Sequence, residues 1–349
     1  MRSGRARSYW AIGALPAITA IVIGAFGASV PVASAAANPL KGKTVKLIIP
    51  FSPGGGFDMT ARLLVPYLEQ YTGATVVPEN VTGGGGMVGE NTLYASAPNG
   101  LTIGEVGPDA AVINSVTKTP GVTYQPQKFV WLAGATASST VLLETTKAPY
   151  TSLKALENAT NGITVGATGA GDNDFYAGVV MFKGIGMGVQ WVTGYSGSSQ
   201  LVDGLASGKP AAILVGGDTA YEAIKNGFGR PLLQINVNHH PQLLHIPTIL
   251  QVVSKKSPDY KYAKAMSDVE TADRAFALPP GTNKAMTNAW RVAFAKTFHN
   301  KQFLAKMAQA GLTAAFHSGV VMQQRIGAAM KEAKVLVPLL QKANASLGS

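Results

Sequence analysis

The sequence predicts an α/β protein built from two doubly wound lobes around a cleft. Short apolar runs alternate with segments of helical spacing, a pattern typical of parallel sheets covered by helices. Glycine-rich loops also recur between a predicted strand and a predicted helix, at 54–56, 83–86 and 166–171. Because ligands of such sheets bind beyond the carboxyl ends of the strands, these loops mark the candidate site.

The composition sets limits on the function. The 349 residues are 46% hydrophobic and 13% charged, which is enough for a large core in one or two domains. The absence of cysteine excludes disulfides and thiolate metal sites. The net charge of +11 suits an anionic ligand or an anionic surface. Nucleic acid is not an expected partner, because no dense basic stripe is interleaved with aromatic residues.

The first 35 residues have the pattern of a secretory signal peptide. Three arginines precede an apolar stretch at 11–32, and Ala33-Ser34-Ala35 supplies a small-residue cleavage site. A retained membrane anchor is the alternative, since the apolar stretch is almost long enough to span a bilayer. Pro16 and the small-residue end favour cleavage near Ala35. We therefore expect an exported protein, in the periplasm or on the outer face of the cytoplasmic membrane.

The first strand, loop and helix are expected at Val45–Ile49, Pro50–Phe57 and Met59–Tyr71, with Asp58 as the N-cap. Glycines let a backbone approach a ligand closely, and the first amides of a helix attract negative charge. The loop is thus a candidate anion cradle, and a simple tight turn is the alternative. Phe57 either stacks on a ligand or covers the helix start. The candidate ligand-binding residues of this stretch are Ser52, Pro53, Gly54, Gly55, Gly56, Phe57 and Asp58.

Further elements complete the first sheet and lead into the second lobe. A strand at 75–77, a helix at 87–97 and a strand at 101–106 extend a parallel sheet. Two extended runs, 128–132 and 140–143, carry the chain across, and a short helix follows at 153–158. The predicted lobe boundaries are 40–137 plus 276–349 for lobe I, and 138–275 for lobe II.

The second lobe repeats the pattern of strand, glycine loop and helix. A strand at 163–165 and the loop Gly166–Gly171 precede Asp172, the expected N-cap of a helix through Phe182. Further strands are expected at 190–193, 211–215 and 232–236, with a helix at 200–206. The candidate ligand-binding residues of this lobe are Thr168, Gly169, Ala170, Gly171, Asp172, Tyr195, Ser198 and Asp218. For the last three, an exposed turn or a helix cap is the alternative.

The C-terminal part, 283–347, is predicted to be mostly helical, with breaks at Gly311 and Gly319. Trp290, Phe294 and Phe298 recur at helical spacing and are expected in the core. His239 and His240 are expected in a surface loop, because adjacent histidines seldom converge on one ion. No metal site and no cofactor are predicted.

Several of these blocks together resemble the tripartite tricarboxylate transporter receptors, also called Bug proteins. Residues 46–58, which read Lys-Leu-Ile-Ile-Pro-Phe-Ser-Pro-Gly-Gly-Gly-Phe-Asp, resemble the opening motif of that family. Pro78-Glu79-Asn80 and Ala97-Pro98-Asn99-Gly100 resemble its next block. Residues 208–217, 246–248 and 277–282 follow in the family's order, so the resemblance covers nearly the whole chain after the signal.

The resemblance implies a type II periplasmic-binding-protein fold and a receptor that delivers small organic acids to membrane transporter subunits. In that family the ligand carboxylate is typically held by backbone amides of the proline-glycine loop. The loop of the second lobe usually reads Ser-x-Gly-x-Gly-Ser-x-x-His. Here Gly169 and Gly171 match, but Asp172 replaces Ser or Thr and Phe175 replaces His.

These departures bear on the ligand. A carboxylate at Asp172 would repel a ligand carboxylate, unless it only caps the helix, which is the interpretation we favour. If Asp172 or Asp174 faces the cleft, the ligand is expected to carry an amine or a hydroxyl group there. The sequence therefore favours a monocarboxylate, an amino acid or a hydroxy acid over a tricarboxylate.

No catalytic motif fits its required context. The glycine loops at 54–56 and 166–171 lack the G-x-G-x-x-G spacing of dinucleotide-binding proteins, and no G-x-S-x-G is present. We therefore predict a receptor rather than an enzyme. An enzyme acting on a small carboxylate, or a ligand sensor for a membrane kinase, remains the alternative.

Overall fold

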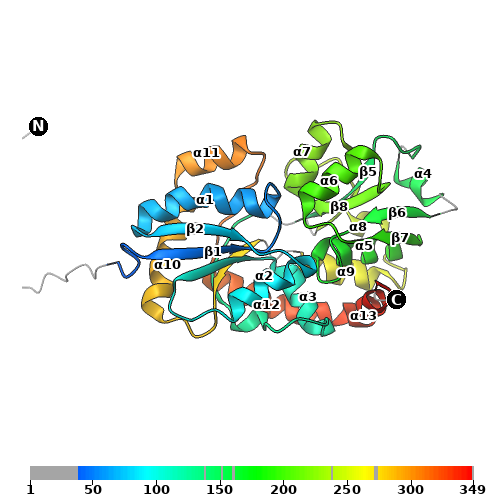
Figure 1. Cartoon of the computed structure of the whole chain (residues 1–349). Coiled ribbons are helices and arrows are strands. Elements are labelled where there is room, and N and C mark those ends of the chain that lie inside the picture. The colour runs from blue at the N-terminus through cyan, green and yellow to red at the C-terminus, as the bar shows by residue number, and fades with distance from the viewer. Residues whose placement is uncertain are drawn as a thin grey trace, which may run out of the picture. The chain divides into compact units, whose positions relative to one another are not determined.

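The computed structural model describes residues 38–136, 139–150, 152–158, 162–236, 239–270 and 274–347 (Figure 1). From Asn38 onward the chain forms one compact unit. The expected signal peptide, residues 1–35, lies outside the described residues. Within the described ranges, no helix combines the length and apolar composition that crossing a membrane requires.

Lobe I is built on a six-stranded sheet with the order β11-β4-β10-β3-β1-β2. Strands β1, β2 and β3 are parallel neighbours, as the sequence predicts. Strand β10 lies antiparallel between β3 and β4, because the chain returns to this sheet from the other lobe. The strands are β1 (Thr44–Ile49), β2 (Thr75–Asn80), β3 (Thr102–Val106), β4 (Val130–Gly134), β10 (Ala275–Leu278) and β11 (His317–Ser318).

Helices cover both faces of this sheet. Alternate residues of β1 face opposite sides: Leu47 and Ile49 pack in one buried cluster, and Ile48 packs in the other. The first cluster includes residues of α1, α10 and α11, and the second includes residues of α2, α3 and α12. These helices are α1 (Gly56–Thr72), α2 (Met87–Tyr94), α3 (Pro108–Thr117), α10 (Lys284–Phe298), α11 (Lys301–Gln309) and α12 (Gly319–Glu332).

Lobe II is built on a five-stranded sheet with the order β7-β6-β8-β5-β9. Strand β6 is parallel to β7 and β8, and β5 is antiparallel to β8 and β9. The strands are β5 (Thr140–Thr145), β6 (Ile163–Gly166), β7 (Val189–Val192), β8 (Ala212–Gly216) and β9 (Gly229–Ile235). The helices are α4 (Leu153–Glu157), α5 (Asn173–Gly184), α6 (Ser198–Ser207), α7 (Gly217–Lys225), α8 (Ile249–Val252) and α9 (Tyr260–Val269).

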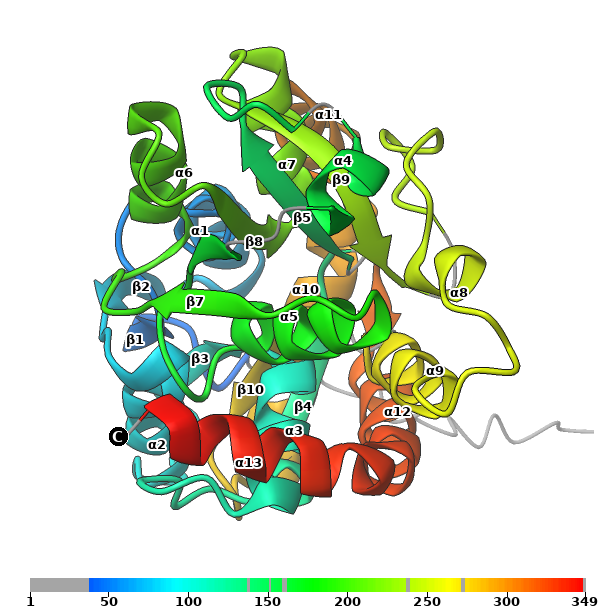
Figure 2. The same cartoon turned by 90° about the vertical axis from the view of Figure 1, so that its right-hand side faces the viewer.

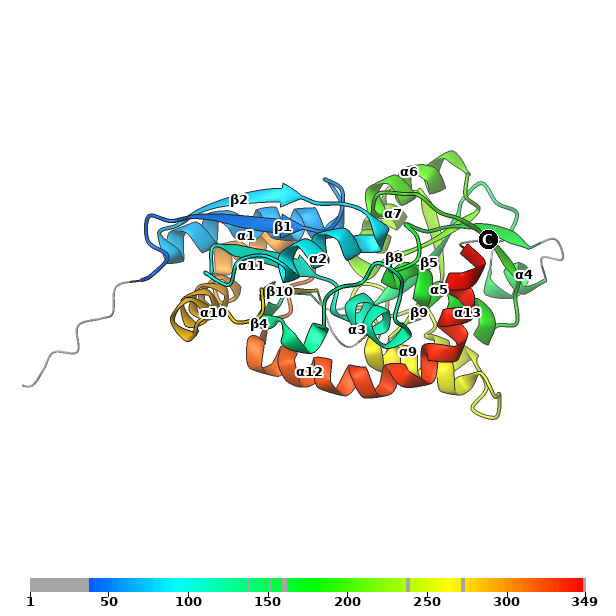
Figure 3. The same cartoon turned by 60° about the horizontal axis from the view of Figure 1, so that its bottom comes forward.

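The C-terminal helices extend along both lobes (Figures 2 and 3). After α12 and a short 3-10 turn (Ala333–Leu336), α13 (Val337–Leu347) runs past α3 and α5. Gln341 Nε2 donates to Thr117 O of lobe I at 2.9 Å, and Asn344 Nδ2 lies 3.3 Å from the Tyr176 hydroxyl of lobe II. One buried apolar cluster includes residues of α3, α5, α9 and α12, so the lobes share a continuous core on this side.

Several expected boundaries differ from those in the structure. Helix α1 begins at Gly56 with Gly55 as the N-cap, so the prediction of Asp58 as the N-cap is wrong. Helix α6 begins at Ser198, two residues before the expected start. The predicted core residues Trp290, Phe294 and Phe298 are buried, which confirms the helical spacing.

Candidate functional site

A cavity lies where the loops that follow the parallel strands of both lobes meet. Its volume of about 80 Å³ leaves room for roughly five to eight water molecules. Lobe I lines it with Phe51, Phe57, Gly85, Glu90, Gly107, Asp109 and Ala110. The segments between the lobes add Thr136, Ser139, Thr140 and Arg274. Lobe II adds Thr168, Asp172, Asn173, Asp174, Ser198, Gly216, Gly217, Asp218 and Thr219.

The glycine loops of the two lobes touch at the edge of this cavity. Gly85 has a φ of +63°, and a Cβ there would collide with the backbone nitrogen of Asp172 in lobe II. Gly171 has a φ of +103°, and its Cβ would lie 2.7 Å from Gly84 O. Asn114 Nδ2 donates to Gly171 O at 2.8 Å and ties α3 to the same loop. Close approach of the lobes therefore requires glycine at these two positions.

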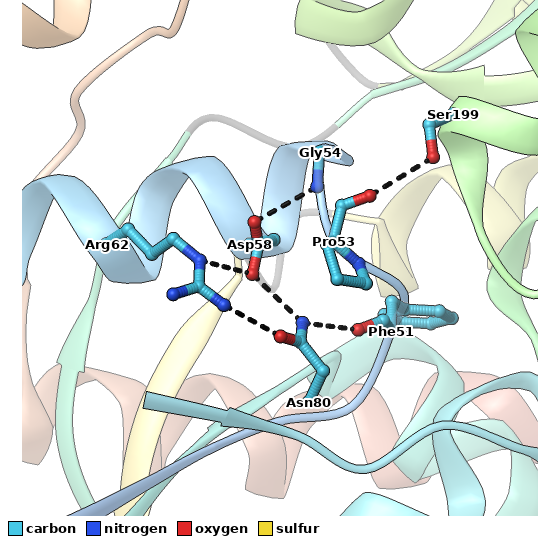
Figure 4. Close-up of polar contacts among 7 residues, drawn as sticks. All are labelled: Phe51, Pro53, Gly54, Asp58, Arg62, Asn80 and Ser199. Atoms are coloured by element: carbon cyan, nitrogen blue, oxygen red, sulfur yellow. Dashed lines mark hydrogen bonds and ion pairs between the residues drawn. The ribbon is translucent and has the colours of Figure 1, made fainter. Parts of the chain in front are cut away.

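The first glycine loop is held by a carboxylate of its own helix (Figure 4). Asp58, which is 4% exposed, accepts from Gly54 N at 3.0 Å, Arg62 Nε at 2.8 Å and Asn80 Nδ2 at 2.9 Å. Asn80 Nδ2 also donates to Phe51 O at 2.8 Å. The expectation that the Gly54 amide faces a ligand is therefore wrong, because this amide is already used within the loop.

Lobe II closes over the same loop. Ser52 N donates to Ser196 O at 3.3 Å, and Ser199 Oγ lies 3.4 Å from Pro53 O (Figure 4). A Cβ on Gly55 would lie 2.9 Å from Ser198 Oγ. The opening loop of lobe I is thus in contact with the start of α6.

Asp172 and Asp174 both line the cavity. Asp172 occupies the N-cap position of α5, but its side chain makes no capping hydrogen bond. It accepts instead a short hydrogen bond from Thr168 Oγ1. Asp172 therefore lies at the predicted N-cap position and also lines the cavity, as the alternative interpretation of a carboxylate facing the cleft requires.

Among the described residues of the cavity wall, Arg274 is the one cationic side chain. Its guanidinium carbon lies 5.0 Å from the centroid of the Phe57 ring. Its Nη2 would lie 2.8 Å from a Cβ on Gly56 and 2.9 Å from a Cβ on Gly216. The guanidinium is thus placed between the starts of α1 and α7. Nη1 is buried and has no hydrogen-bond partner in the described part of the chain.

Sequence reasoning missed Arg274. The available signal was the charged pair Asp273-Arg274 before the apolar run Ala275–Leu278, since charged residues there interrupt an expected extended segment. The sequence alone does not show that this strand end faces the glycine loops of both lobes. The fold brings the three segments together.

Acidic groups surround the same cavity, and burial dominates their titration. Loss of solvation raises the pKa of Glu90 to about 8, the pKa of Asp109 to about 7 and the pKa of Asp172 to about 6. Burial likewise raises the pKa of Asp174 well above its usual value, with Asp172 and Glu270 as further causes. Near neutral pH, this cluster therefore holds protons that exposed carboxyls would have lost.

Asp218 has a structural contact set besides its place on the cavity wall. Its Oδ1 lies 3.1 Å from His240 Nε2 and accepts from Thr313 N at 3.1 Å. His240 is 1% exposed, so the prediction of a surface loop is wrong for this residue. No group of three or more potential metal ligands is present among the described residues.

Comparison with known proteins places this geometry in a family. The sequence model of one protein family, described as the tripartite tricarboxylate transporter family receptor, matches residues 60–342. The chain belongs to this family. The solved structure of the periplasmic binding protein BugD has a TM-score of 0.70 at 20% identity, covering 88% of this chain and 98% of that one. The chain thus has the two-lobe, type II periplasmic-binding-protein fold expected from the sequence.

Individual relatives are distant or match over part of their length. Protein BugT of Bordetella pertussis (strain Tohama I) is 31% identical over 111 residues, which are 32% of this chain and 33% of that protein. A UPF0065 protein from the tcbD-tcbE intergenic region of Pseudomonas sp. (strain P51) is 25% identical over 220 residues, 60% of this chain and 63% of that protein. The chain therefore matches less than two thirds of the length of either relative.

One similar structure carries an organic acid. MatC (Rpa3494) of Rhodopseudomonas palustris, solved with bound malate, has a TM-score of 0.71 at 18% identity and covers 84% of this chain and 99% of that one. A likeness at this identity establishes the fold alone.

The receptor's predicted site residues fall into separate groups in the structure. Phe57, Thr168, Asp172, Ser198 and Asp218 line the main cavity. Gly54, Gly55 and Gly56 line a neighbouring pocket of about 200 Å³ next to α6 and α7. Gly169 and Ala170 line a third pocket beside α13. Ser52, Pro53, Asp58, Gly171 and Tyr195 line none of these pockets.

Proposed function

We propose that this chain is an exported solute-binding receptor that captures a small organic carboxylate in the cavity between its lobes. One observation carries the proposal: the buried Nη1 of Arg274, without a partner among the described residues, on the wall of a small cavity closed by both lobes. A buried guanidinium nitrogen without an acceptor is costly unless a ligand supplies one. A carboxylate matches its planar fork of donors.

The helix starts beside Arg274 add to this preference. Helices α1 and α7 begin at Gly56 and Gly217, on either side of the guanidinium. The first amides of both helices favour negative charge. We therefore assign the ligand carboxylate to Arg274 and these helix starts. This assignment replaces the Gly54 amide, which Asp58 already engages.

The two lobes supply the motion that a receptor needs. We propose lobe boundaries of 40–137 plus 276–349 and of 138–275, a division that splits the two sheets except for Ala275, the first residue of β10. Helix α13 contacts both lobes and lies outside this simple division. Opening at the glycine loops would admit the ligand, and closure would shield it from water.

Ligand binding tests the proposal directly. Thermal unfolding of the purified protein is measured with a panel of mono-, di- and tricarboxylates and of amino and hydroxy acids. Millimolar amounts of a true ligand should raise the melting temperature, because ligand binds only the folded state. Arg274→Gln should abolish the rise, whereas Lys225→Gln, which removes an exposed cation from α7, should preserve it. If the protein converted the bound carboxylate into a product, the result would instead support the alternative of an enzyme that acts on a small carboxylate.

Delivery and export need experiments in cells. We propose that the closed receptor docks on membrane subunits of a tripartite tricarboxylate-type transporter after removal of residues 1–35. Deleting the receptor should abolish uptake of its ligand while the membrane subunits are still made. The mature chain should appear in the periplasmic fraction. Normal uptake without the receptor would contradict delivery and would favour the sensory alternative.

A further inference from the structure

The cavity wall has two poles of opposite charge. One pole is the guanidinium of Arg274 between the starts of α1 and α7. The other pole is a group of carboxyls at the starts of two other helices: Asp109 in the first turn of α3, and Asp172 and Asp174 at the start of α5. Glu90 and Asp218 add further carboxyls to this wall, and its described residues include no second cation.

Several polar atoms of residues on this wall have no hydrogen-bond partner in the described part of the chain. Ser139 is 2% exposed, lines the cavity, and its Oγ makes no hydrogen bond within the described ranges. Asn173 Oδ1 is likewise buried and unpaired, although its Nδ2 donates to Glu270 Oε1 at 2.6 Å. Together with Arg274 Nη1, these atoms offer two acceptors and a charged donor to a ligand. Buried polar atoms in native proteins rarely stay unpaired.

We propose that the ligand is a zwitterion, a small amino carboxylate whose carboxylate pairs with Arg274 and whose ammonium group lies among Asp109, Asp172 and Asp174. This inference rests on the proposed function and narrows its ligand class. The ammonium group donates three hydrogen bonds, and carboxylate oxygens, Ser139 Oγ and Asn173 Oδ1 can accept them. A dicarboxylate would instead bring its second negative charge against the acidic pole.

The size of the cavity limits the candidates. With a volume of about 80 Å³, it suits a ligand of a few carbon atoms. The linear amino acids with an ammonium at the α or the terminal carbon, from glycine to 6-aminohexanoate, cover this range. A tricarboxylate carries two further negative charges, for which the described part of the wall has no second cation.

The competing explanation of this acidic wall is that Asp172 and Asp174 are uncharged when the ligand is bound. If Asp172 and Asp174 stay protonated in the complex, they can donate to a second ligand carboxylate or to a hydroxyl. Both explanations place the ligand in the same cavity. They differ in what removal of the acidic groups does, because an ammonium group loses its counter-charge whereas a carboxylate loses a repulsive neighbour.

The first experiment compares ligands of equal length. Calorimetric titrations use butyrate, 4-aminobutyrate, 2-aminobutyrate, succinate and butylamine, and the corresponding sets from two to six carbons. We expect an amino acid to bind at least roughly tenfold more tightly than the carboxylate or dicarboxylate of equal length. Tighter binding of a dicarboxylate would overturn the zwitterion and leave the carboxylate receptor intact. Binding of the amine alone would overturn both, and so would no binding across the panel.

The second experiment uses the double variant Asp172→Asn, Asp174→Asn, with the single variants alongside. Affinity for the amino acid should fall roughly tenfold or more, while affinity for the carboxylate of equal length should hold or rise. Asp259→Asn removes a carboxylate of lobe II that pairs with Lys183 outside the cavity. This control variant should change neither the affinity for the amino acid nor the affinity for the carboxylate. Circular dichroism confirms folding. An equal loss for both ligands in a folded variant would overturn the acidic pole as an ammonium site.

Discussion

A single carboxylate, Asp58, organises the first glycine loop. It accepts three hydrogen bonds while remaining 4% exposed, so its removal leaves the Gly54 amide and two side chains without their acceptor. Hydrogen bonds to charged groups contribute more than neutral ones. Asp58 is thus a structural residue whose position beside the cavity shapes the backbone that the ligand approaches.

We expect Asp58→Ala to destabilise the protein by about 1–3 kcal/mol, because it removes the charged acceptor of three hydrogen bonds. The measurement is the free energy of unfolding from urea titrations followed by circular dichroism. Glu79→Ala serves as the control, since its ion pair with Lys46 is about half exposed and should contribute less than about 1 kcal/mol. Equal losses for the two variants would show that the network does not hold the loop.

Glu90 gives a residue-scale prediction about pH. Burial raises the pKa of Glu90 from 4.5 to about 8, and its Oε1 accepts from Gly107 N at 3.0 Å. A carboxyl with a raised folded-state pKa stabilises the fold fully below its unfolded pKa, and this stabilisation is lost as the pH rises through the folded value. The glutamine variant keeps the acceptor and removes the proton equilibrium.

Glu90→Gln should therefore match the wild type near pH 4 to 5 and exceed its stability by on the order of 2–4 kcal/mol near pH 9. Urea titrations of both proteins across this range measure the difference. Burial also raises the pKa values of Asp109 and Asp172. Both residues are present in both proteins, so their contributions to the pH dependence of stability cancel to first order. A difference that does not change with pH would show that folding does not raise the pKa of Glu90.

At the scale of elements, the loops between strands and helices decide how closely the lobes approach. Gly85 and Gly171 both have positive φ and both lie against the backbone of the other lobe. We expect Gly85→Ala to hold the lobes apart and to reduce ligand-dependent thermal stabilisation strongly, at little cost to the core. Gly227→Ala is the matched control, because it has a φ of +74° and its Cβ would meet nothing within 4 Å.

Small-angle scattering with and without ligand would follow the closure. Both glycine variants carry a similar backbone strain of about 1–2 kcal/mol. A difference in ligand response therefore reports the contact between lobes. If Gly227→Ala impaired the response as much as Gly85→Ala, the loop contact would not control closure.

The elements themselves were largely predictable from the sequence, because local patterns encode them. The apolar runs at β1, β6 and β8 and the glycine loops after β1 and β6 are all found where the pattern places them. The roles of single carboxylates were not predictable. Asp58 and Asp172 both have the local signature of an N-cap, yet one binds the backbone before its helix and the other lines the cavity. Arg274 was missed because its role depends on three segments distant in sequence.

At the scale of the whole described chain, two kinds of contact join the lobes. On one side lies a continuous apolar core that includes α3, α5 and α12, and at the cavity edge lie glycine loops that meet through backbone contacts. Separating the core would expose a large apolar surface, whereas parting the loops breaks few hydrogen bonds. Motion that admits a ligand should therefore open at the loops and pivot about the shared core.

The charge of the site depends on several parts of the fold. Acidic side chains reach this region from α2, β3, α3, the start of α5 and the residue after α9. These acids are Glu90, Glu105, Asp109, Asp172, Asp174 and Glu270, and Arg274 is the cation beside them. Burial raises the pKa of each of these six acids. An ammonium ligand favours their ionised forms, so its binding should release protons, whereas a second carboxylate favours the protonated forms and should take protons up.

We therefore expect affinity for an amino carboxylate to rise as the pH increases from about 5 to about 8, the range in which Asp172 and Asp109 ionise. Affinity for the dicarboxylate of equal length should fall over the same range. Calorimetry at one pH in buffers of different ionisation enthalpy gives the number of protons released, and titrations across the range give the slope. In Asp172→Asn, Asp174→Asn the slope for the amino acid should flatten. If affinity for the amino acid falls with rising pH in the wild type, the acidic pole does not hold its ammonium group.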